Sequence, residues 1–415
     1  MTGQTILLRE ALASLAYLSR LVLTNFRSLV HLDLALPPGV TVFFGANAQG
    51  KTTLLEAAYL LAIGRSFHAQ TEREVINFEA AVCGEPAVAG GTIEKGGQRH
   101  MVYVGYRPIA GAAGGQRTPG DLGYSVHKEV RVDRQRQSTA GLVGLLGAVL
   151  FSAEDLALVQ GPPAGRRRYL DILVSQADPV YLRSLQRYQR VVQQRNRLLR
   201  MVKEGRAQAG ELEFWDAELA REGALITWLR RQAATALARL CAAHHRELSG
   251  VEEELALEYR PSVIPGEDLA DTQRGFGLRL ERLRPRELAA GTTLLGPHRD
   301  DFLLLRLSGA GQGQGVDLGT FASRGEARTL ALTLRLAEAA YLAAARGDEP
   351  VVLLDDVLSE LDFRRRRLVL EKTAQYQQVL ITTTDLALAA EFFGPRATYF
   401  RVEGGAVTPF TLPGA

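Results

Sequence analysis

The chain has 415 residues, of which 46% are hydrophobic and 23% are charged, and these proportions exclude an intrinsically disordered or a fibrous protein. Its 49 Lys/Arg against 46 Asp/Glu give a net charge of only +3, which excludes a polycation of the histone type. Two cysteines, Cys83 and Cys241, are too few for a disulfide framework or a cysteine-ligated zinc site.

The chain carries no signal for membranes or export. Charged residues or glycines interrupt every apolar stretch before the roughly 18 residues that a membrane span needs. Residues 1–18 lack the apolar segment and small-residue cleavage site of a secretory signal. We therefore expect a cytoplasmic protein with no membrane partner.

The first 150 residues predict strands and one early helix. The apolar run from Thr52 to Ile63 has helical periodicity and stops at Gly64. Residues 80–150 alternate as in a β-rich region, with glycine clusters that mark turns at 84–97 and 111–120. Strands are expected at 19–26, 31–36 and 41–44.

Residues 179–203 predict an amphipathic helix with a stripe of arginines. Its apolar side chains recur every three or four residues on one face, interrupted once by Arg195. A polar loop at 204–210 leads to a second helical pattern from Trp215 to Leu240, so the two helices form an antiparallel hairpin. Between 166 and 206 the chain has eleven Lys/Arg against three Asp/Glu. The polar face of the first helix carries Arg183, Arg187, Arg190 and Arg197.

The strongest motif lies between the strand at 41–44 and the helix at 52–63. It fits the phosphate-binding loop G-x-x-x-x-G-K-[ST], whose backbone N–H groups and helix N-terminus cradle phosphates. Lys51 would bridge the β- and γ-phosphates of ATP and Thr52 would hold Mg²⁺. The alternative is a glycine-rich turn that happens to carry Lys51. The expected nucleotide contacts are Gly45, Ala46, Asn47, Ala48, Gln49, Gly50, Lys51, Thr52 and Thr53.

The second half of this site is expected far along the chain. Strand-like signals return from Val251, a helix is expected from about Ser323 to Ala345, and a buried strand at 351–354 ends in Asp355 and Asp356. Asp355 would hold Mg²⁺, and Asp356 would polarise the attacking water, which makes Asp356 and Lys51 the expected catalytic residues. Because 303 residues separate Thr52 from Asp355, a large insertion must divide the nucleotide-binding head.

These observations predict an α/β fold, a P-loop ATPase head assembled from both chain ends with an inserted helical arm domain. We expect the first half of the head at 1–165, the arm at 166–290 and the second half of the head at 291–415.

The segment from Phe321 to Arg328 adds a possible site for a second nucleotide. Ser323, followed by Gly325 at the start of a helix, offers a hydroxyl and backbone N–H groups to an anion; the alternative is an ordinary helix cap with Glu326. With Ser359-Glu-Leu-Asp362, it resembles the signature motif and D-loop of ABC-type ATPases. That resemblance implies a homodimer that forms on ATP, in which Ser323 and Gly325 face the partner's nucleotide.

Over residues 19–405 the chain resembles the RecF family, bacterial recombination mediators related to SMC-type ATPases. The resemblance implies ATP-dependent binding of duplex or gapped DNA, a weak ATPase that acts as a switch, and cooperation with RecR and RecO in loading RecA during DNA repair. The segments that carry it are Leu23–Arg27, Leu61–Phe67, Phe151–Asp155, Arg166–Asp171, Leu295-Gly-Pro-His-Arg-Asp-Asp301, Leu354–Asp362 and Thr382–Asp385.

The chain departs from the ABC pattern in three places. Asp356 stands where transport ATPases have glutamate. The Q-loop glutamine is missing around Ser152–Asp155, and Glu154 or Asp155 is the candidate replacement. The switch histidine is also absent, with Thr383 or Thr384 nearest its place. An ABC transporter ATPase subunit and an SMC-like chromosome-structure ATPase are the alternative functions. The long separation of the nucleotide motifs disfavours the first, and the short hairpin disfavours the second.

Basic residues in three places are candidates for contacts with DNA phosphates, without sequence preference. For each, the alternative is an ordinary solvated charge or, for Arg65, a charge at a helix C-terminus. His298 either braces the nucleotide state or is a satisfied loop histidine. No basic surface interleaved with aromatic residues is evident for base stacking. The DNA candidates are Arg65, Arg166, Arg167, Arg183, Arg187, Arg190 and Arg197.

Overall fold

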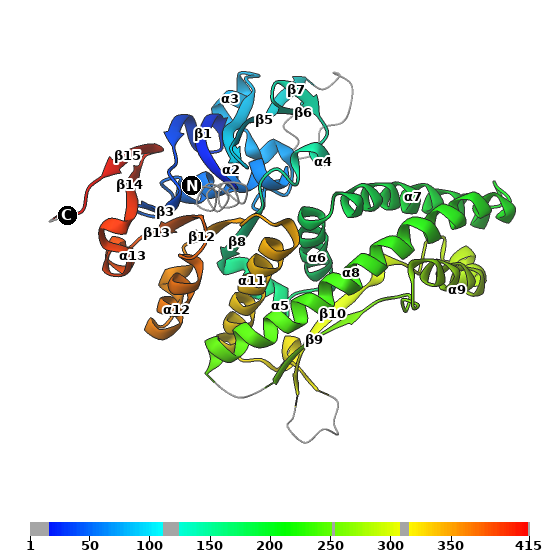
Figure 1. Ribbon diagram of the computed structural model, residues 1–415. Coiled ribbons are helices and arrows are strands. Elements are labelled where there is room, and N and C mark those ends of the chain that lie inside the picture. Colours follow the sequence, from blue (N-terminus) through cyan, green and yellow to red (C-terminus); the bar gives the residue numbers. More distant parts are fainter. Residues whose placement is uncertain (1–15, 111–123, 251–253, 308–314, 414–415) are drawn as a thin grey trace, which may run out of the picture. The chain divides into compact units, whose positions relative to one another are not determined.

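The computed structural model describes residues 16–110, 124–250, 254–307 and 315–413 (Figure 1). It divides into two compact units, one of residues 1–153 with 342–415, the head unit, and one of residues 154–341, the arm unit. The expectations for the first fifteen residues and for a turn at 111–120 lie outside the described residues. The arm unit begins before and ends after the expected range of 166–290, because strands and helices on both sides of the hairpin pack with it.

The head unit contains a mainly parallel sheet in the order β15-β14-β3-β13-β12-β8. Strands β3 and β8 come from the N-terminal part and the others from the C-terminal part, so the head is assembled from both chain ends, as predicted. The central strands are continuous apolar runs, as expected for strands covered on both faces. The strands are β3 (Gly39–Phe44), β8 (Ala148–Ser152), β12 (Val351–Asp355), β13 (Gln378–Thr383), β14 (Ala397–Glu403) and the antiparallel β15 (Ala406–Phe410).

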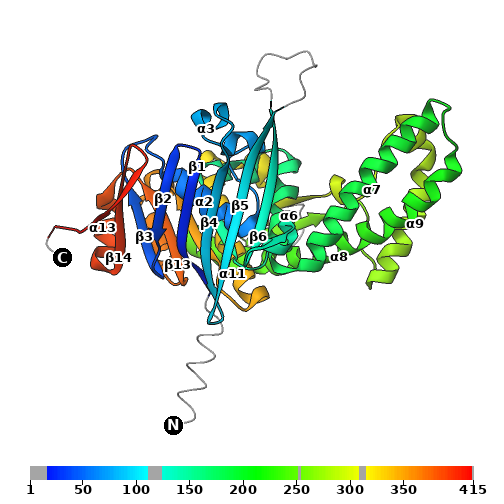
Figure 2. The ribbon, with the colours of Figure 1, turned by 90° about the horizontal axis from the view of Figure 1, so that it is seen from above.

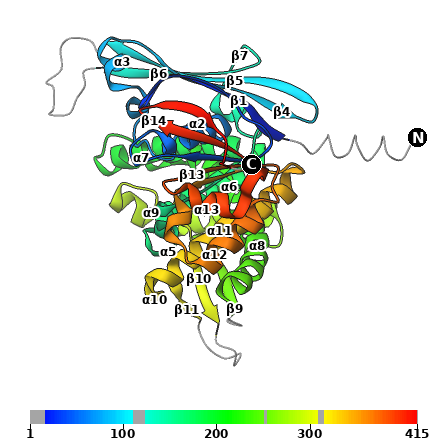
Figure 3. The same ribbon diagram turned by 90° about the vertical axis from the view of Figure 1, so that its left-hand side faces the viewer.

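A second, antiparallel sheet in the order β2-β1-β4-β5-β6-β7 lies in the same unit (Figure 2). Helix α2 (Lys51–Ile63) contacts strands of both sheets and lies between them (Figure 3). Most of its side chains are therefore buried, which explains why its sequence is apolar on all sides. The strands are β1 (Ala16–Phe26), β2 (Leu29–Ala35), β4 (Ala87–Lys95), β5 (Gln98–Ala110), β6 (Tyr124–Val132) and β7 (Gln135–Gln137).

Shorter helices complete the head unit. They are α3 (Phe78–Val82), α4 (Thr139–Leu142), α12 (Phe363–Thr373) and α13 (Leu386–Phe393), with single 3₁₀ turns at Glu72–Val75, Val357–Glu360 and Gly394–Arg396. No helix among the described residues is long and apolar enough to cross a membrane.

The arm unit is built on the predicted hairpin of α7 (Pro179–Lys203) and α8 (Leu212–Ser249), with α9 (Leu269–Ala290) packed on both (Figure 1). The sequence reading did not predict α9, because Gly275, Gly277 and Pro285 interrupt its pattern. The other elements are α5 (Leu156–Gln160), α6 (Pro163–Ala177), β9 (Glu254–Arg260), β10 (Asp301–Leu307), β11 (Val316–Asp317), α10 (Leu318–Phe321) and most of α11 (Arg324–Arg346). The strands form a sheet in the order β11-β10-β9.

Arg195, the exception in the apolar face of α7, is completely buried between the three helices. Its guanidinium donates hydrogen bonds to Asp216 at 2.7 Å, to Glu287 at 2.6 Å and to the hydroxyl of Thr293 at 2.9 Å. These partners come from α8, α9 and the segment after α9. A buried cation with this many partners ties the helices together rather than binding a ligand.

The Gly-Pro-His-Arg-Asp-Asp segment attaches β10 to the hairpin. Asp300 is completely buried and accepts hydrogen bonds from Arg230 at 3.1 Å, from the hydroxyl of Tyr259 at 2.5 Å and from the backbone N–H of Ser262 at 2.7 Å. Arg230 also bonds Asp171 at 2.7 Å. The Gly-Pro-His-Arg-Asp-Asp segment therefore has a structural part in the arm unit.

His298 in the same segment lies against Tyr188 of α7. Its Nδ1 is 2.6 Å from the tyrosine hydroxyl, and burial lowers the pKa of His298 to about 4. The imidazole is therefore neutral at physiological pH, which favours the satisfied loop histidine over a charged sensor. Gly296 has φ +123°, and a Cβ there would lie 2.1 Å from the Tyr188 hydroxyl, so the turn requires glycine.

Replacing Arg195 by alanine should strongly destabilise the arm unit. Glu287 is fully buried and would lose its guanidinium partner, so we expect the free energy of unfolding to fall by about 3–5 kcal/mol. Arg197→Ala removes an exposed charge from the same helix and should leave stability nearly unchanged. Urea unfolding followed by helical circular dichroism measures both, and similar midpoints for the two variants would contradict the structural role of Arg195.

Candidate nucleotide site

The predicted phosphate-binding loop lies between β3 and α2 and has the backbone that such a loop needs. Ala48 and Gly50 have φ of +61° and +102°. A Cβ on Gly45 would lie 2.2 Å from the carbonyl oxygen of Val402, so β14 passes too close for any other residue. The loop is thus held against the sheet at its first glycine.

Gln49 fixes the far side of the loop to the turn between β14 and β15. Its side-chain oxygen accepts a hydrogen bond from the N–H of Gly404 at 2.6 Å, and its carbonyl accepts one from Gly405 at 3.3 Å. The loop conformation therefore depends on residues more than 350 positions away in the sequence.

Lys51 points back under the loop. Its side chain is 6% exposed, and its Nζ donates to the carbonyl oxygens of Gly45 at 2.9 Å and Ala46 at 2.8 Å. Burial lowers the pKa of Lys51, while the charges of Asp356 and Asp355 raise it. An ammonium held here is placed to meet phosphate oxygens in the loop.

Two threonine hydroxyls hold the Asp355 carboxylate at the edge of the sheet. Thr52 and Thr382 donate to its Oδ1 at 2.9 Å and 2.7 Å. Burial raises the pKa of Asp355, and the two hydroxyl hydrogen bonds lower it. A carboxylate beside a hydroxyl is the oxygen donor set that Mg²⁺ prefers, so Thr52 and Asp355 fit the metal role expected from the sequence.

Asp356, directly after the strand, is held in a left-handed conformation with φ +50°. Its backbone N–H lies 3.0 Å from the Thr382 hydroxyl and donates to it. Its Oδ1 is buried and has no hydrogen-bond partner among the described residues. Because buried carboxylate oxygens are nearly always satisfied, this atom fits a bound water or metal-bound water. The site thus suits Mg²⁺ and a water nucleophile.

Ser323 and Gly325 are exposed at the beginning of α11 in the arm unit. The N–H of Glu326 donates to the Ser323 hydroxyl at 3.3 Å, so the serine caps the helix. The Glu326 carboxylate pairs with Arg306 instead of returning to the cap. Ser323 therefore caps the helix, but Glu326 does not complete a capping box. The exposed hydroxyl of Ser323 and the exposed Gly325 also fit the expected anion site.

Thr382 contacts both aspartates of the site, and the sequence reading assigned it no role there. The reading considered Thr383 and Thr384 as substitutes for a switch histidine, but the Thr383 hydroxyl hydrogen-bonds to the backbone of Asp385. Thr382 is the direct partner of Asp355 in the parallel pairing of β12 and β13. The carboxyl ends of neighbouring parallel strands meet at one edge, and this signal could have identified Thr382.

The suggestion that Asp155 replaces the Q-loop glutamine meets a competing contact. Asp155 is buried and accepts a hydrogen bond from Arg335 at 2.6 Å, within the arm unit. Its carboxylate is therefore already used for packing α11 against the segment after β8.

The basic candidates for DNA differ in how exposed they are. Arg166 was expected to contact DNA, but it is buried and forms a bidentate pair with Asp301 at 2.7 and 2.8 Å, so we correct that expectation. Arg167 is half-buried and donates to the carbonyl of Asp300. Arg187 lies 3.6 Å from Glu222. The exposed candidates are Arg65, Arg183, Arg187, Arg190 and Arg197.

Comparison with known proteins agrees with this architecture. The sequence matches the family described as RecF/RecN/SMC N terminal domain over residues 17–393. The proteins named DNA replication and repair protein RecF from Herpetosiphon aurantiacus and Roseiflexus castenholzii are each 42% identical, and the matches cover 95% of this chain and 100% of each relative. The solved structure of the recombination mediator protein RecF-ATP in the RecFOR pathway is similar with a TM-score of 0.83 and 30% identity, over 96% of this chain and 99% of that one.

Gly45→Ala should damage nucleotide binding without removing any charged group. The added methyl group would collide with the backbone of Val402, which cannot turn away as a side chain would, so we expect ATP affinity to fall about tenfold or more. Gly210→Ala, where a methyl group meets open space, is the control. Equilibrium binding of a fluorescent ATP analogue measures both, and unchanged affinity in Gly45→Ala would contradict the close approach of β14.

Proposed function

We propose that this chain, which belongs to the RecF family of DNA replication and repair proteins, uses ATP to dimerise and to hold gapped DNA. Its family membership and its likeness to the solved structure of RecF-ATP support ATP binding, ATPase activity and a role in DNA repair and recombination. The cluster of Thr52, Asp355 and Thr382 beneath the phosphate loop is the observation that carries the mechanism.

In this mechanism each side chain has one task. Lys51 would meet the phosphates in place of the loop carbonyls, and Thr52 and Asp355 would hold Mg²⁺, which would neutralise phosphate charge. Asp356 uses its unpaired oxygen to orient the attacking water. Thr382 is a positioning residue, because its hydroxyl hydrogen-bonds to both aspartates and so fixes where they lie.

In this proposal, a second copy of the chain supplies Ser323 and Gly325 to each nucleotide site, so ATP binding and dimerisation are coupled. Ser323 and Gly325 are exposed at a helix N-terminus, where a hydroxyl and N–H groups can meet the γ-phosphate held by a second copy. Hydrolysis would remove that contact and let the copies separate. The slow, switch-like character of the ATPase belongs to this proposal, since the shorter side chain of Asp356 reaches less far than a glutamate.

For DNA, the proposal relies on backbone contacts made by exposed arginines. Arg183, Arg190 and Arg197 project from α7 into solvent, and Arg65 is exposed at the end of α2. Such contacts give affinity for duplex or junction DNA with strong salt dependence and without sequence choice. Cooperation with RecR and RecO in loading RecA, and a cytoplasmic location, follow from the family resemblance.

Asp356→Asn should separate ATP binding from hydrolysis. The amide keeps the size of the carboxylate but is a poor acceptor of the proton from water, so we expect near-normal ATP affinity, a hydrolysis rate lowered about 100-fold and a dimer that persists with ATP. Lys51→Met should lose both binding and dimer. Light scattering and phosphate release measure these, and a monomer in every case would contradict the ATP-dependent dimer.

Arg183→Ala with Arg197→Ala should weaken binding to a labelled gapped duplex in the presence of ATP. Each lost phosphate contact should make the negative slope of log affinity against log salt less steep by about 0.9. Arg279→Ala with Arg282→Ala removes two exposed charges from α9 of the same unit and is the matched control. Equal effects of the two pairs would show a general charge effect and contradict a specific role for the α7 stripe. Lys51→Met should abolish the ATP-dependent part of binding.

A further inference from the structure

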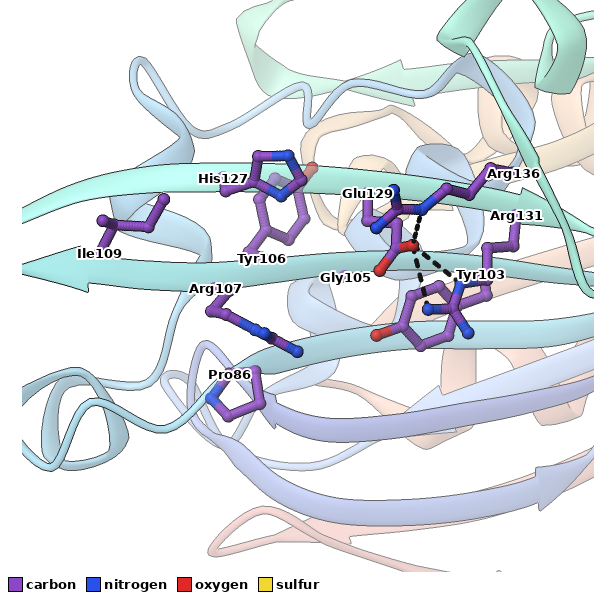
Figure 4. A pocket seen from close by; sticks show the side chains of 10 residues that line it. All are labelled: Pro86, Tyr103, Gly105, Tyr106, Arg107, Ile109, His127, Glu129, Arg131 and Arg136. Atoms are coloured by element: carbon purple, nitrogen blue, oxygen red, sulfur yellow. Dashed lines mark hydrogen bonds and ion pairs between the residues drawn. The ribbon is translucent and has the colours of Figure 1, made fainter.

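The antiparallel sheet of the head unit has a shallow groove on its exposed face, about 280 Å³ in volume (Figure 4). It runs over β5, β6 and β7 and shares no residue with the nucleotide site at the start of α2. We call it the outer-sheet groove. Its lining includes Tyr103, Gly105, Arg107, Glu129, Arg131 and Arg136.

At one end of the groove, the ring of Tyr103 and the guanidinium of Arg131 lie against each other. Gly105 has no side chain, and the ring of Tyr103 occupies the space that a Cβ there would need, within 2.4–2.8 Å. The guanidinium of Arg131 lies over this ring, 5.3 Å from its centroid. Tyr103 and Arg131 are also direct partners in the pairing of β5 and β6. Rings and guanidinium planes are the two side-chain surfaces on which unpaired bases stack.

The groove is positively charged. Arg131 and Arg136 both donate to Oε1 of Glu129, at 3.0 and 2.6 Å, and these bonds lower the pKa of Glu129. That carboxylate is therefore shared by two cations. Arg107 is exposed and has no side-chain hydrogen bond to the described residues, and in Figure 4 it extends toward Tyr103. Three guanidinium groups against one carboxylate leave an excess of two positive charges.

We propose that the outer-sheet groove binds a short unpaired stretch of single-stranded DNA, with a base on the Tyr103–Arg131 stack and phosphates near Arg107 and Arg136. This rests on the proposed DNA-binding function and adds a contact that the helical arm does not provide. A stacking surface within a positive groove is the common design of sites for single strands. Arginine clusters also bind acidic peptides, but such a peptide does not need the contact between the Tyr103 ring and the Arg131 guanidinium, which favours a base.

The structure also explains why the sequence indicated no such surface. Tyr103 and Arg107 come from β5, Arg131 from β6 and Arg136 from β7. Along the chain these residues are separated by alternating inward-facing side chains and by a long connection, so no aromatic and basic residues interleave. Only the register of the strands brings them together.

The main test uses a labelled oligothymidine of twelve nucleotides, with fluorescence anisotropy and the full chain. Tyr103→Leu should weaken binding about tenfold, because a stacked base contributes strongly to affinity. Tyr103→Phe keeps the ring and should bind as the parent protein does. Gly105→Ala keeps the ring and every charge but displaces the ring, so it should also weaken binding. Arg107→Ala should make the negative slope of log affinity against log salt less steep by about 0.7.

Controls separate this proposal from the proposed function. The same variants should bind a blunt duplex with ATP as the parent does and should keep its thermal stability, whereas the α7 double variant should lose duplex binding. Oligothymidine binding that Tyr103→Leu and Gly105→Ala leave unchanged would overturn the groove proposal alone. A parent protein that binds no DNA of any form would overturn both. Tyr103-dependent binding of a labelled acidic peptide ending in phenylalanine, without such an effect on oligothymidine, would instead identify a peptide site.

Discussion

The Asp355 carboxylate, held by two hydroxyls at the edge of the parallel sheet, is the interaction on which the head depends. One hydroxyl comes from Thr52 at the start of α2 and the other from Thr382 at the end of β13, so three segments far apart in sequence must be in register for the site to exist. The pairing of β12 with β13, and of β13 with β3, supplies that register. The nucleotide site therefore exists only when the two halves of the head are paired, and the entropy of closing the insertion between them rises only slowly with its length.

The arm unit shows that a positive local charge is a poor measure of what is free to bind DNA. Of the eleven basic residues between 166 and 206, Arg166 and Arg195 are buried in bidentate or multiple contacts. Isolated charges cannot be buried without partners, so each takes carboxylates out of solvent with it. The arginines proposed to contact DNA lie on the exposed side of α7, where, among the described residues, Arg187 alone of the four has an ion pair.

Sequence patterns were sufficient where one side chain or one short segment decides the outcome. The phosphate loop, α7, β12 and the two-ended head were predicted because spacing and periodicity are local properties. Thr382, α9 and the burial of Arg166 were not, because they depend on strand pairing, on tertiary contacts that stabilise a helix with Gly and Pro inside it, and on a partner at position 301. The arrangement of Tyr103 and Arg131 across two strands is of the same kind.

Helix α2 connects the nucleotide site to both sheets of the head. Its first residues, Lys51 and Thr52, contact the phosphate loop and Asp355, while its body packs on β1, β4 and β5. Glu56 in its middle pairs with Arg27, which follows β1, and accepts a hydrogen bond from Ser66, which follows the helix. Closely packed interiors transmit small shifts rather than absorb them. A displacement of α2 when Lys51 leaves the loop carbonyls for phosphate would therefore reach the sheet that carries the outer-sheet groove, and this path needs no contact between the two units.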